Sequence, residues 1–191
     1  VDWGDMVVLV RSPKRNAETF QKAFNQEGIP LIANTGGFLE SREVQDLLAL
    51  LKTLDNPLQD VPILATLRSP FGQITAAELA EIRTRSQAVR YWDAFQEFVH
   101  AEPEEEADRV LVESVGLRER AARFYQNFQT WRQALRKGTL AGTLELAIQT
   151  VDYESWFLGL DDAPERMANV RRMVSLASGF DRRYRKGLFR F

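Results

Sequence analysis

Apolar residues recur at helical spacing along most of the chain, and this periodicity predicts a mainly α-helical protein. The clearest stripe predicts a helix that ends at Asn56-Pro57, because proline cannot continue a helix. Its apolar members are Val44, Leu47, Leu48, Leu51 and Leu54. A longer helix is predicted to end at Gly138, with Arg136 and Lys137 in its last turn, as the helix dipole favours. Its apolar face consists of Leu117, Ala121, Phe124, Phe128, Trp131 and Leu135.

Shorter helices are predicted around these two. One lies at residues 63–67 and ends at Ser69-Pro70. The next follows Thr75, which with Glu78 has the spacing of a capping box. The last begins at residues 162–164 and is predicted to end near Gly179. Its predicted buried residues are Val170, Met173, Val174 and Ala177.

Aromatic residues lie mostly at helical spacing, which favours a place in the core over a platform for stacking bases. A helix over residues 89–100 is predicted to bury Trp92, Phe95 and Phe98. Phe124, Phe128 and Trp131 are assigned to the same core. Trp156 and Phe157 are also predicted to pack inside the protein.

The first 37 residues have the only β-like pattern. Residues 6–10 form a short apolar run that predicts a strand, and a helix follows that carries Phe20, Ala23 and Phe24 inward and ends at Gly28. Residues 30–32 predict a second extended segment, and the loop at residues 34–37 contains the pair Gly36-Gly37. The predicted order here is therefore β-α-β.

Composition narrows the class of protein without naming a function. The 191 residues are 45% hydrophobic, with no cysteine and a net charge of −2, which is typical of a globular protein and excludes a disulfide framework. The absence of cysteine fits a reducing compartment, so the expected location is the cytoplasm. No apolar stretch is long enough to predict a membrane span. A chain with this net charge can attract nucleic acid only through a local patch. The best candidate is the basic run at the C-terminus, made of Arg182, Arg183, Arg185, Lys186 and Arg190.

Motifs for catalysis are missing from the sequence. There is no GxxxxGK[ST] phosphate loop, no GxSxG motif and no HExxH motif, and His100 is the only histidine. The acidic residues between Glu102 and Asp108 have the composition of a solvated linker, although a divalent cation would suit carboxylates. The sequence therefore predicts no catalytic residue, no metal site and no cofactor in this chain.

Three segments resemble superfamily-one DNA helicases of the UvrD, Rep and RecB kind. DMVVLVRS at residues 5–12, followed by GIP at residues 28–30, is similar to the family's "LxRS…GIP" pattern. TGGFLESREVQD at residues 35–46 and its continuation to Asp60 resemble "GGxxFFExxEVxDLLxLLRLLxNPxxD". LATLRSPFG at residues 64–72 is similar to "LxxVLRSPLFGLS" of the AddA-like helicase/exonuclease subunits. Weaker likeness returns at residues 166–173 and 187–191.

The resemblance implies a piece of a longer helicase rather than a complete motor. Residues 1–38 would belong to the second RecA-like motor domain and its hinge, and residues 39–191 to a helical, bundle-like insertion subdomain. Gly36, Gly37, Glu40 and Glu43 are expected to hold this hinge. ATP and magnesium would be bound by the parent protein outside this chain, and the expected partners are DNA, the remaining helicase domains and a nuclease subunit.

The resemblance also suggests where DNA is contacted. In Rep-like relatives, the turn after the segment that corresponds to Arg68-Ser69-Pro70 belongs to a helix-hairpin-helix-like element that touches duplex DNA. The matching residues here are Arg68, Ser69, Gly72, Gln73 and Thr75. This sequence lacks the second glycine of the relatives' "GIG" turn, and packing of Phe71 and Ile74 is the alternative interpretation. The function expected is a non-catalytic accessory region that positions duplex DNA for unwinding in repair and recombination. The alternative is a scaffold that docks the partner nuclease subunit without touching DNA.

Overall fold

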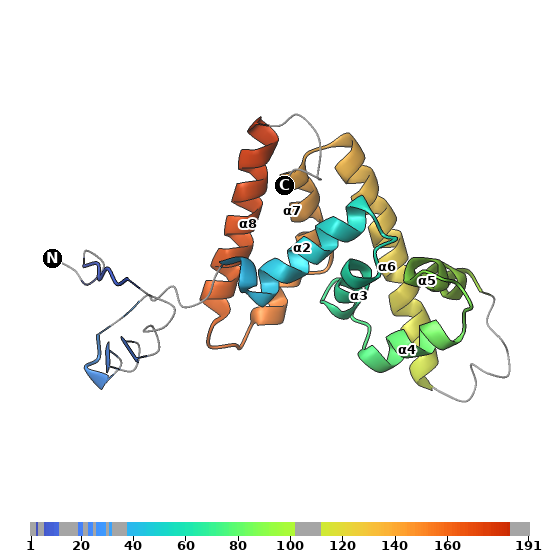
Figure 1. Cartoon of the computed structure of the whole chain (residues 1–191), viewed down its shortest axis with the longest axis horizontal. Coiled ribbons are helices and arrows are strands. Elements are labelled where there is room, and N and C mark those ends of the chain that lie inside the picture. The colour runs from blue at the N-terminus through green and yellow to red at the C-terminus, as the bar shows by residue number, and fades with distance from the viewer. Residues whose placement is uncertain are drawn as a thin grey trace. The chain divides into compact units, whose positions relative to one another are not determined.

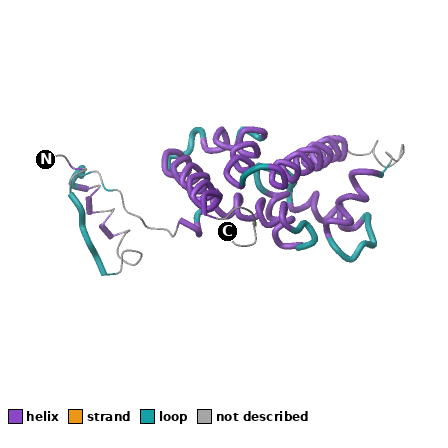
Figure 2. Tube along the Cα trace, turned by 90° about the horizontal axis from the view of Figure 1, so that it is seen from above, coloured by secondary structure: helices purple, strands orange, loops and turns teal. Residues whose placement is uncertain are grey.

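A computed structural model describes residues 3, 6–11, 19–20, 23–24, 26–29, 31, 38–101 and 112–183. The chain divides into two compact units, residues 1–41 and residues 42–191. The second unit contains nearly all of the described secondary structure and is entirely helical in its described residues (Figures 1 and 2). This confirms the prediction of a mainly α-helical protein.

The first unit differs from the predicted β-α-β piece. Residues 6–10 form no strand, and most of their side chains are exposed. A strand exists only through hydrogen bonds to a neighbouring strand, and the described residues provide none. The predicted helix is present in part, with the ring of Phe20 packed edge-on against that of Phe24. Gly28 ends it with a φ of 66°, as the sequence predicts. The 3-10 helix η2 (Phe38–Glu40) follows near the end of the unit.

The second unit consists of seven helices and one 3-10 helix in its described part. In chain order these are α2 (Arg42–Asp55), α3 (Asp60–Arg68), α4 (Ala76–Thr84), α5 (Tyr91–His100), α6 (Val112–Lys137), α7 (Leu140–Thr150), η3 (Tyr153–Phe157) and α8 (Ala163–Arg183). α6 packs against α5, α2 and α7, and α2 packs against α3 and α8 (Figure 1). The long helix α6 thus joins the α4–α5 end of the unit to the α7–α8 end.

Helix α2 crosses the middle of this unit and is buried over more of its surface than the apolar stripe predicts. Val44, Leu47, Leu51 and Leu54 are buried as expected, and Asn56-Pro57 follows the end of the helix. Leu50 is also fully buried, whereas Leu48 is only half-buried. More of α2 is buried than one stripe because the helix has partners on several sides.

The aromatic core lies between α5, α6 and the turn that follows α3. Trp92 and Phe95 on α5 pack against Phe128 and Phe124 on α6, with ring centroids 4.6 Å and 5.7 Å apart. Trp131, one helical turn further along α6, is fully buried. These rings are core residues, as their spacing predicts.

Helix α8 is longer than its sequence predicts. It continues past Gly179 to Arg183. Glycine in a helix costs about 1 kcal/mol relative to alanine, which contacts elsewhere can offset. The contact here is Asp181, whose carboxylate accepts hydrogen bonds from the backbone N–H groups of Leu140 and Ala141 at the start of α7, at 3.0 Å and 2.9 Å. No helix among the described residues is long and apolar enough to cross a membrane.

Candidate nucleic-acid interface

The turn between α3 and α4 is closed by its own backbone. Ser69 follows the last residue of α3, and its carbonyl accepts hydrogen bonds from the N–H groups of Gly72 and Gln73, at 3.0 Å and 2.9 Å. The N–H of Ile74 then reaches back to the carbonyl of Leu67, at 2.9 Å. Three backbone hydrogen bonds between residues 67 and 74 therefore close this turn.

Gly72 lies where no side chain fits. A Cβ at this position would lie 2.5 Å from the Cα of Leu67 and closer still to its carbonyl oxygen. Gly72, named from the sequence as a DNA-contact candidate, is thus a position where the backbone packs closely against Leu67 within the protein itself. The flanking residues Phe71 and Ile74 are buried, and the Phe71 ring stacks on Tyr153 at 4.8 Å. These two residues pack in the core, as the alternative interpretation of the turn predicts.

Gln73 has a left-handed backbone conformation, with a φ of 58°. For a residue other than glycine this conformation is uncommon and costs about 1–2 kcal/mol. Its side-chain amide donates to the carbonyl of Pro70 at 3.3 Å, which satisfies one of its donors locally. The surrounding hydrogen bonds hold Gln73 in this conformation at the rim of the turn.

The N-terminus of α4 is capped as predicted. The Thr75 hydroxyl oxygen accepts a hydrogen bond from the N–H of Glu78 at 3.3 Å, and the Glu78 carboxylate accepts one from the N–H of Thr75 at 2.8 Å. The same carboxylate forms an ion pair with Arg120 on α6. A negative charge therefore already occupies the positive end of α4, where a phosphate would otherwise bind.

The predicted DNA-binding residues of this turn differ in their exposure to solvent. Arg68 and Thr75 are exposed and Gln73 is half-buried, whereas Ser69 and Gly72 are buried. The Ser69 hydroxyl donates to the carbonyl of Thr66 at 2.7 Å. Of the side chains named for this turn, Arg68 is the exposed one that carries a positive charge.

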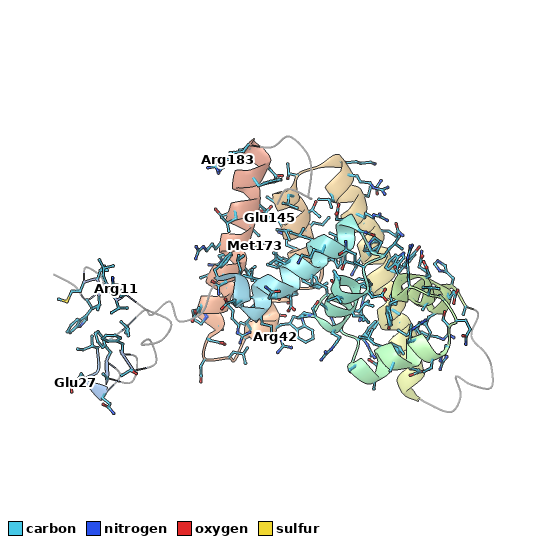
Figure 3. All side chains as sticks on the ribbon, viewed as in Figure 1. Arg11, Glu27, Arg42, Glu145, Met173 and Arg183 are labelled. Carbon is cyan, nitrogen blue, oxygen red and sulfur yellow. The ribbon has the colours of Figure 1, made fainter. Side chains whose placement is uncertain are left out.

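The basic run at the C-terminus is described only in its first part. Arg182 and Arg183 are exposed in the last turn of α8, and Figure 3 shows Arg183 at the end of that helix. Arg185 and Lys186 lie outside the described residues, as do Gly36 and Gly37 of the predicted hinge.

A buried polar cluster joins the start of α2 to η3 and α8. The Glu43 carboxylate is 3% exposed and accepts a hydrogen bond from the side-chain amide of Asn169 at 2.7 Å. Arg166 approaches its second oxygen at 3.6 Å. The Tyr153 hydroxyl donates to Asp46 on α2 at 3.0 Å. Glu43 thus ties the first turn of α2 to a helix 126 residues later in the chain.

Ionisation in this cluster reflects its burial. Burial raises the pKa of Asp46, against the hydrogen bond from Tyr153, which lowers it. Burial raises the pKa of Tyr153 far above its ordinary value, and the charge of Asp46 raises it further. Arg166 has a raised pKa because its guanidinium bonds Asp162, whose own pKa is lowered by that bond. The cluster is an arrangement that holds helices together, with no free nucleophile or acid-base pair among these groups.

One apolar loop was missed by the sequence interpretation. Trp156, predicted to pack, is 49% exposed, and the following Leu158 and Leu160 are 69% and 46% exposed. Phe157 between them is buried, as predicted. In a 3-10 helix with three residues per turn, neighbouring side chains point in different directions, so Trp156 and Phe157 cannot both face the core.

Side chains that could together hold a metal ion are not found in the described part of the chain. No cluster of three or more His, Cys, Asp or Glu residues occurs there. His100 is exposed at the end of α5, where its ring nitrogen contacts the carbonyl of Gln96 at 2.7 Å and its ring packs edge-on against Tyr125.

Comparison with known proteins shows the family to which this helical unit belongs. The model of the UvrD-like helicase C-terminal domain matches residues 2–188. The chain belongs to this family. This UvrD-like C-terminal domain is 33% identical over 193 residues to an ATP-dependent helicase/nuclease subunit from Heliobacterium modesticaldum. It is also 33% identical over 192 residues to the corresponding helicase/nuclease subunits from Desulforamulus reducens and Acetivibrio thermocellus.

These relatives are much longer than the chain. Each alignment covers the whole chain, which corresponds to only 14% of the length of the relative. The motifs at residues 5–72 suggest a resemblance to UvrD-type helicases, and the family match confirms it over residues 2–188. The relatives confirm the resemblance to the large helicase/nuclease subunit.

Proposed function

We propose that this chain is a non-catalytic accessory region of an ATP-dependent DNA helicase/exonuclease, where it contacts duplex DNA and positions it for unwinding during repair and recombination. Family membership and the names of the three helicase/nuclease relatives support this proposal. The sequence contains no phosphate-loop motif, so ATP and magnesium would be bound by other regions of the parent protein.

The observation that carries the DNA contact is the exposed Arg68 at the rim of a rigid turn. Its backbone is fixed by the last turn of α3, while its side chain reaches into solvent. A guanidinium on a rigid support loses little backbone entropy when it meets a phosphate, and it can bond two phosphate oxygens at once. Gln73 and Thr75 lie at the same rim and supply polar groups for further contacts.

Charge directs the phosphate toward Arg68 rather than toward the N-terminus of α4. The Glu78 carboxylate lies at that N-terminus and would repel a phosphate there. The proposed contact therefore uses the end of α3, and the helix-hairpin-helix-like element acts through its first helix.

The proposed role of the residues that connect the motor domain to the helical insertion is that of a hinge. We place residues 1–38 in the motor domain and residues 39–191 in the helical insertion. Gly36, Gly37, Glu40 and Glu43 would hold the hinge, and the burial of Glu43 against Asn169 supports a rigid anchor on the helical side. Rigid-body swivelling of the helical unit would then move the Arg68 turn with it.

Fluorescence anisotropy of a labelled DNA duplex tests the contact. Arg68→Ala should weaken binding several-fold at low salt and reduce the slope of log K against log[salt] by about 1, because one phosphate contact is lost. Arg68→Lys should restore most of the slope, since the charge remains.

Arg90→Ala is the matched control. Arg90 is also an exposed arginine at a helix boundary, and it adjoins the opposite end of α3, where the N–H of Tyr91 donates to Asp60. Equal losses in Arg68→Ala and Arg90→Ala would show that only net charge matters, and the proposed contact would then be wrong.

The second candidate function is a scaffold that docks the partner nuclease subunit. The exposed apolar side chains of Trp156, Leu158 and Leu160 favour it, because exposed apolar residues that are close together are typical of protein interfaces. Under this alternative, Trp156→Ser with Leu158→Ser would release the partner subunit from the assembled parent protein, and Arg68→Ala would leave DNA binding unchanged.

A further inference from the structure

Two helix ends that are far apart in the sequence meet at one end of the second unit. Helix α6 ends at Lys137, and α7 begins three residues later at Leu140. The carboxylate of Asp181, near the end of α8, bonds the N–H groups of Leu140 and Ala141. The end of α8 is therefore tied to the start of α7, and the last turns of α6 and α8 lie at the same, upper end of the unit in Figure 1.

Basic residues dominate these two turns, which we call the basic end. It consists of Arg132, Arg136, Lys137, Arg182 and Arg183. All of them are exposed except Arg132, which is half-buried. Asp181 is the sole acid in residues 132–141 and 179–183, and its two oxygens accept hydrogen bonds from α7. The basic end thus has a strong local excess of positive charge in a chain whose net charge is −2.

The helix dipole explains part of this pattern but not all of it. Cations in the last turn of a helix offset its negative end, which accounts for Arg136 and Lys137 on α6 and for the arginines on α8 separately. The dipole acts within each helix and does not require that the two basic turns lie at the same end of the unit. Burial lowers the pKa of Arg132, and so does the charge of Arg136 four residues later on the same helix, whereas the charge of Asp55 raises it.

We propose that the basic end is a second phosphate-binding surface, which contacts the backbone of duplex DNA at a place distinct from the Arg68 turn. The choice of ligand rests on the proposed function, while the surface itself follows from the exposed cations at the ends of α6 and α8, which lie at the same end of the unit. Duplex DNA carries closely spaced phosphates on two strands, so four exposed cations in one region can meet several of them together. Asp181 ties α8 to the start of α7, which directly follows α6, so the cations of both helices are carried by one connected framework.

Two double variants test the proposal in the 191-residue chain. Arg136→Ala/Lys137→Ala and Arg182→Ala/Arg183→Ala each remove two cations from one of the two helices. Each should weaken binding of a labelled duplex about tenfold at low salt and lower the slope of log K against log[salt] by about 2. Arg182→Lys/Arg183→Lys keeps the charge and should keep the slope. Thermal unfolding by circular dichroism confirms that each variant is folded.

A control pair separates the surface from net charge. Arg90→Ala/Arg123→Ala removes two exposed arginines that lie elsewhere, with Arg123 about 20 Å along α6 from Arg136 at 1.5 Å per residue. It should leave the slope nearly unchanged. A slope that falls equally in the control, or that stays at the wild-type value in a folded double variant of the basic end, overturns the proposal.

The outcomes also separate this proposal from the Arg68 contact. Loss of binding in Arg68→Ala, with normal binding in both double variants, would overturn the basic end alone. Loss in both double variants with normal binding in Arg68→Ala would overturn the Arg68 contact alone. Binding unchanged in every variant would overturn both.

Discussion

Removing the Glu43 carboxylate should destabilise the chain more than any exposed acidic substitution. Glu43→Ala deletes the hydrogen bond to Asn169 at 2.7 Å and the contact with Arg166 at 3.6 Å. A hydrogen bond to a charged group contributes about 1.5–3 kcal/mol. Arg166 is 26% exposed and keeps Asp162 as a partner, so its share is below about 1 kcal/mol. Because the carboxylate also costs free energy to bury, we expect a loss of about 2–3 kcal/mol.

Further variants separate the two contacts. Glu43→Gln keeps an oxygen acceptor for Asn169 and loses only the charge, so it should cost about 1 kcal/mol. Asn169→Ala leaves the carboxylate buried without its donor and should cost about 2 kcal/mol. The double variant Glu43→Ala/Asn169→Ala should be less destabilised than the sum of the two singles by about 1–2 kcal/mol, since both singles break the same bond.

Urea unfolding followed by circular dichroism measures these free energies. Glu145→Ala is the matched control, because Glu145 is an exposed acid on α7, labelled in Figure 3, and its loss should change stability by less than about 0.5 kcal/mol. Equal effects of Glu43→Ala and Glu145→Ala would refute the reasoning, as would strict additivity in the cycle with Asn169.

Three other predictions concern the backbone and the pH dependence of stability. Gly72→Ala should cost about 3 kcal/mol in urea unfolding, because its Cβ would lie 2.5 Å from the Cα of Leu67 and backbone must move; a neutral effect would contradict the close approach. Gly179→Ala should stabilise the chain by about 0.5–1 kcal/mol, because residue 179 lies within α8. The added Cβ has room, since its nearest neighbour would be an atom of the flexible Arg182 side chain at 3.9 Å. Destabilisation in urea unfolding would argue that the helix ends near residue 179. Burial raises the pKa of Asp46 above 3.8, so its contribution to stability is present below pH 3.8 and is lost as pH rises through the raised value. Asp46→Asn should therefore become more stable relative to the wild type as pH rises above 3.8 in unfolding titrations, and a constant difference would count against the shift.

Local signals in the sequence predict most helices of the second unit correctly. The capping box at Thr75, the end of α2 before Asn56-Pro57 and the end of α6 at Lys137 all follow from residues within one turn of the boundary. The core rings of α5 and α6 follow from helical spacing. Each of these features depends on neighbours in the chain, which a sequence displays directly.

Features that depend on distant contacts were not predictable in this way. Residues 6–10 have an apolar pattern typical of a strand, but a strand also needs a partner, and the pattern carries no information about one. The exposure of Trp156 depends on which side of η3 meets α8. Within the candidate turn, the sequence names Arg68, Ser69 and Gly72 alike, and only the folded backbone shows that Ser69 and Gly72 are enclosed while Arg68 is exposed.

The sequence by itself therefore determined the helical class, the helix caps, the core rings and the family to which the chain belongs. The tertiary structure decided which residues are neighbours: Glu43 with Asn169, and the start of α7 with the end of α8 through Asp181. The physical reason is distance along the chain. Helix formation depends on interactions over three or four residues, whereas these hydrogen bonds join residues more than forty positions apart, and packing of the whole unit is needed to bring them together.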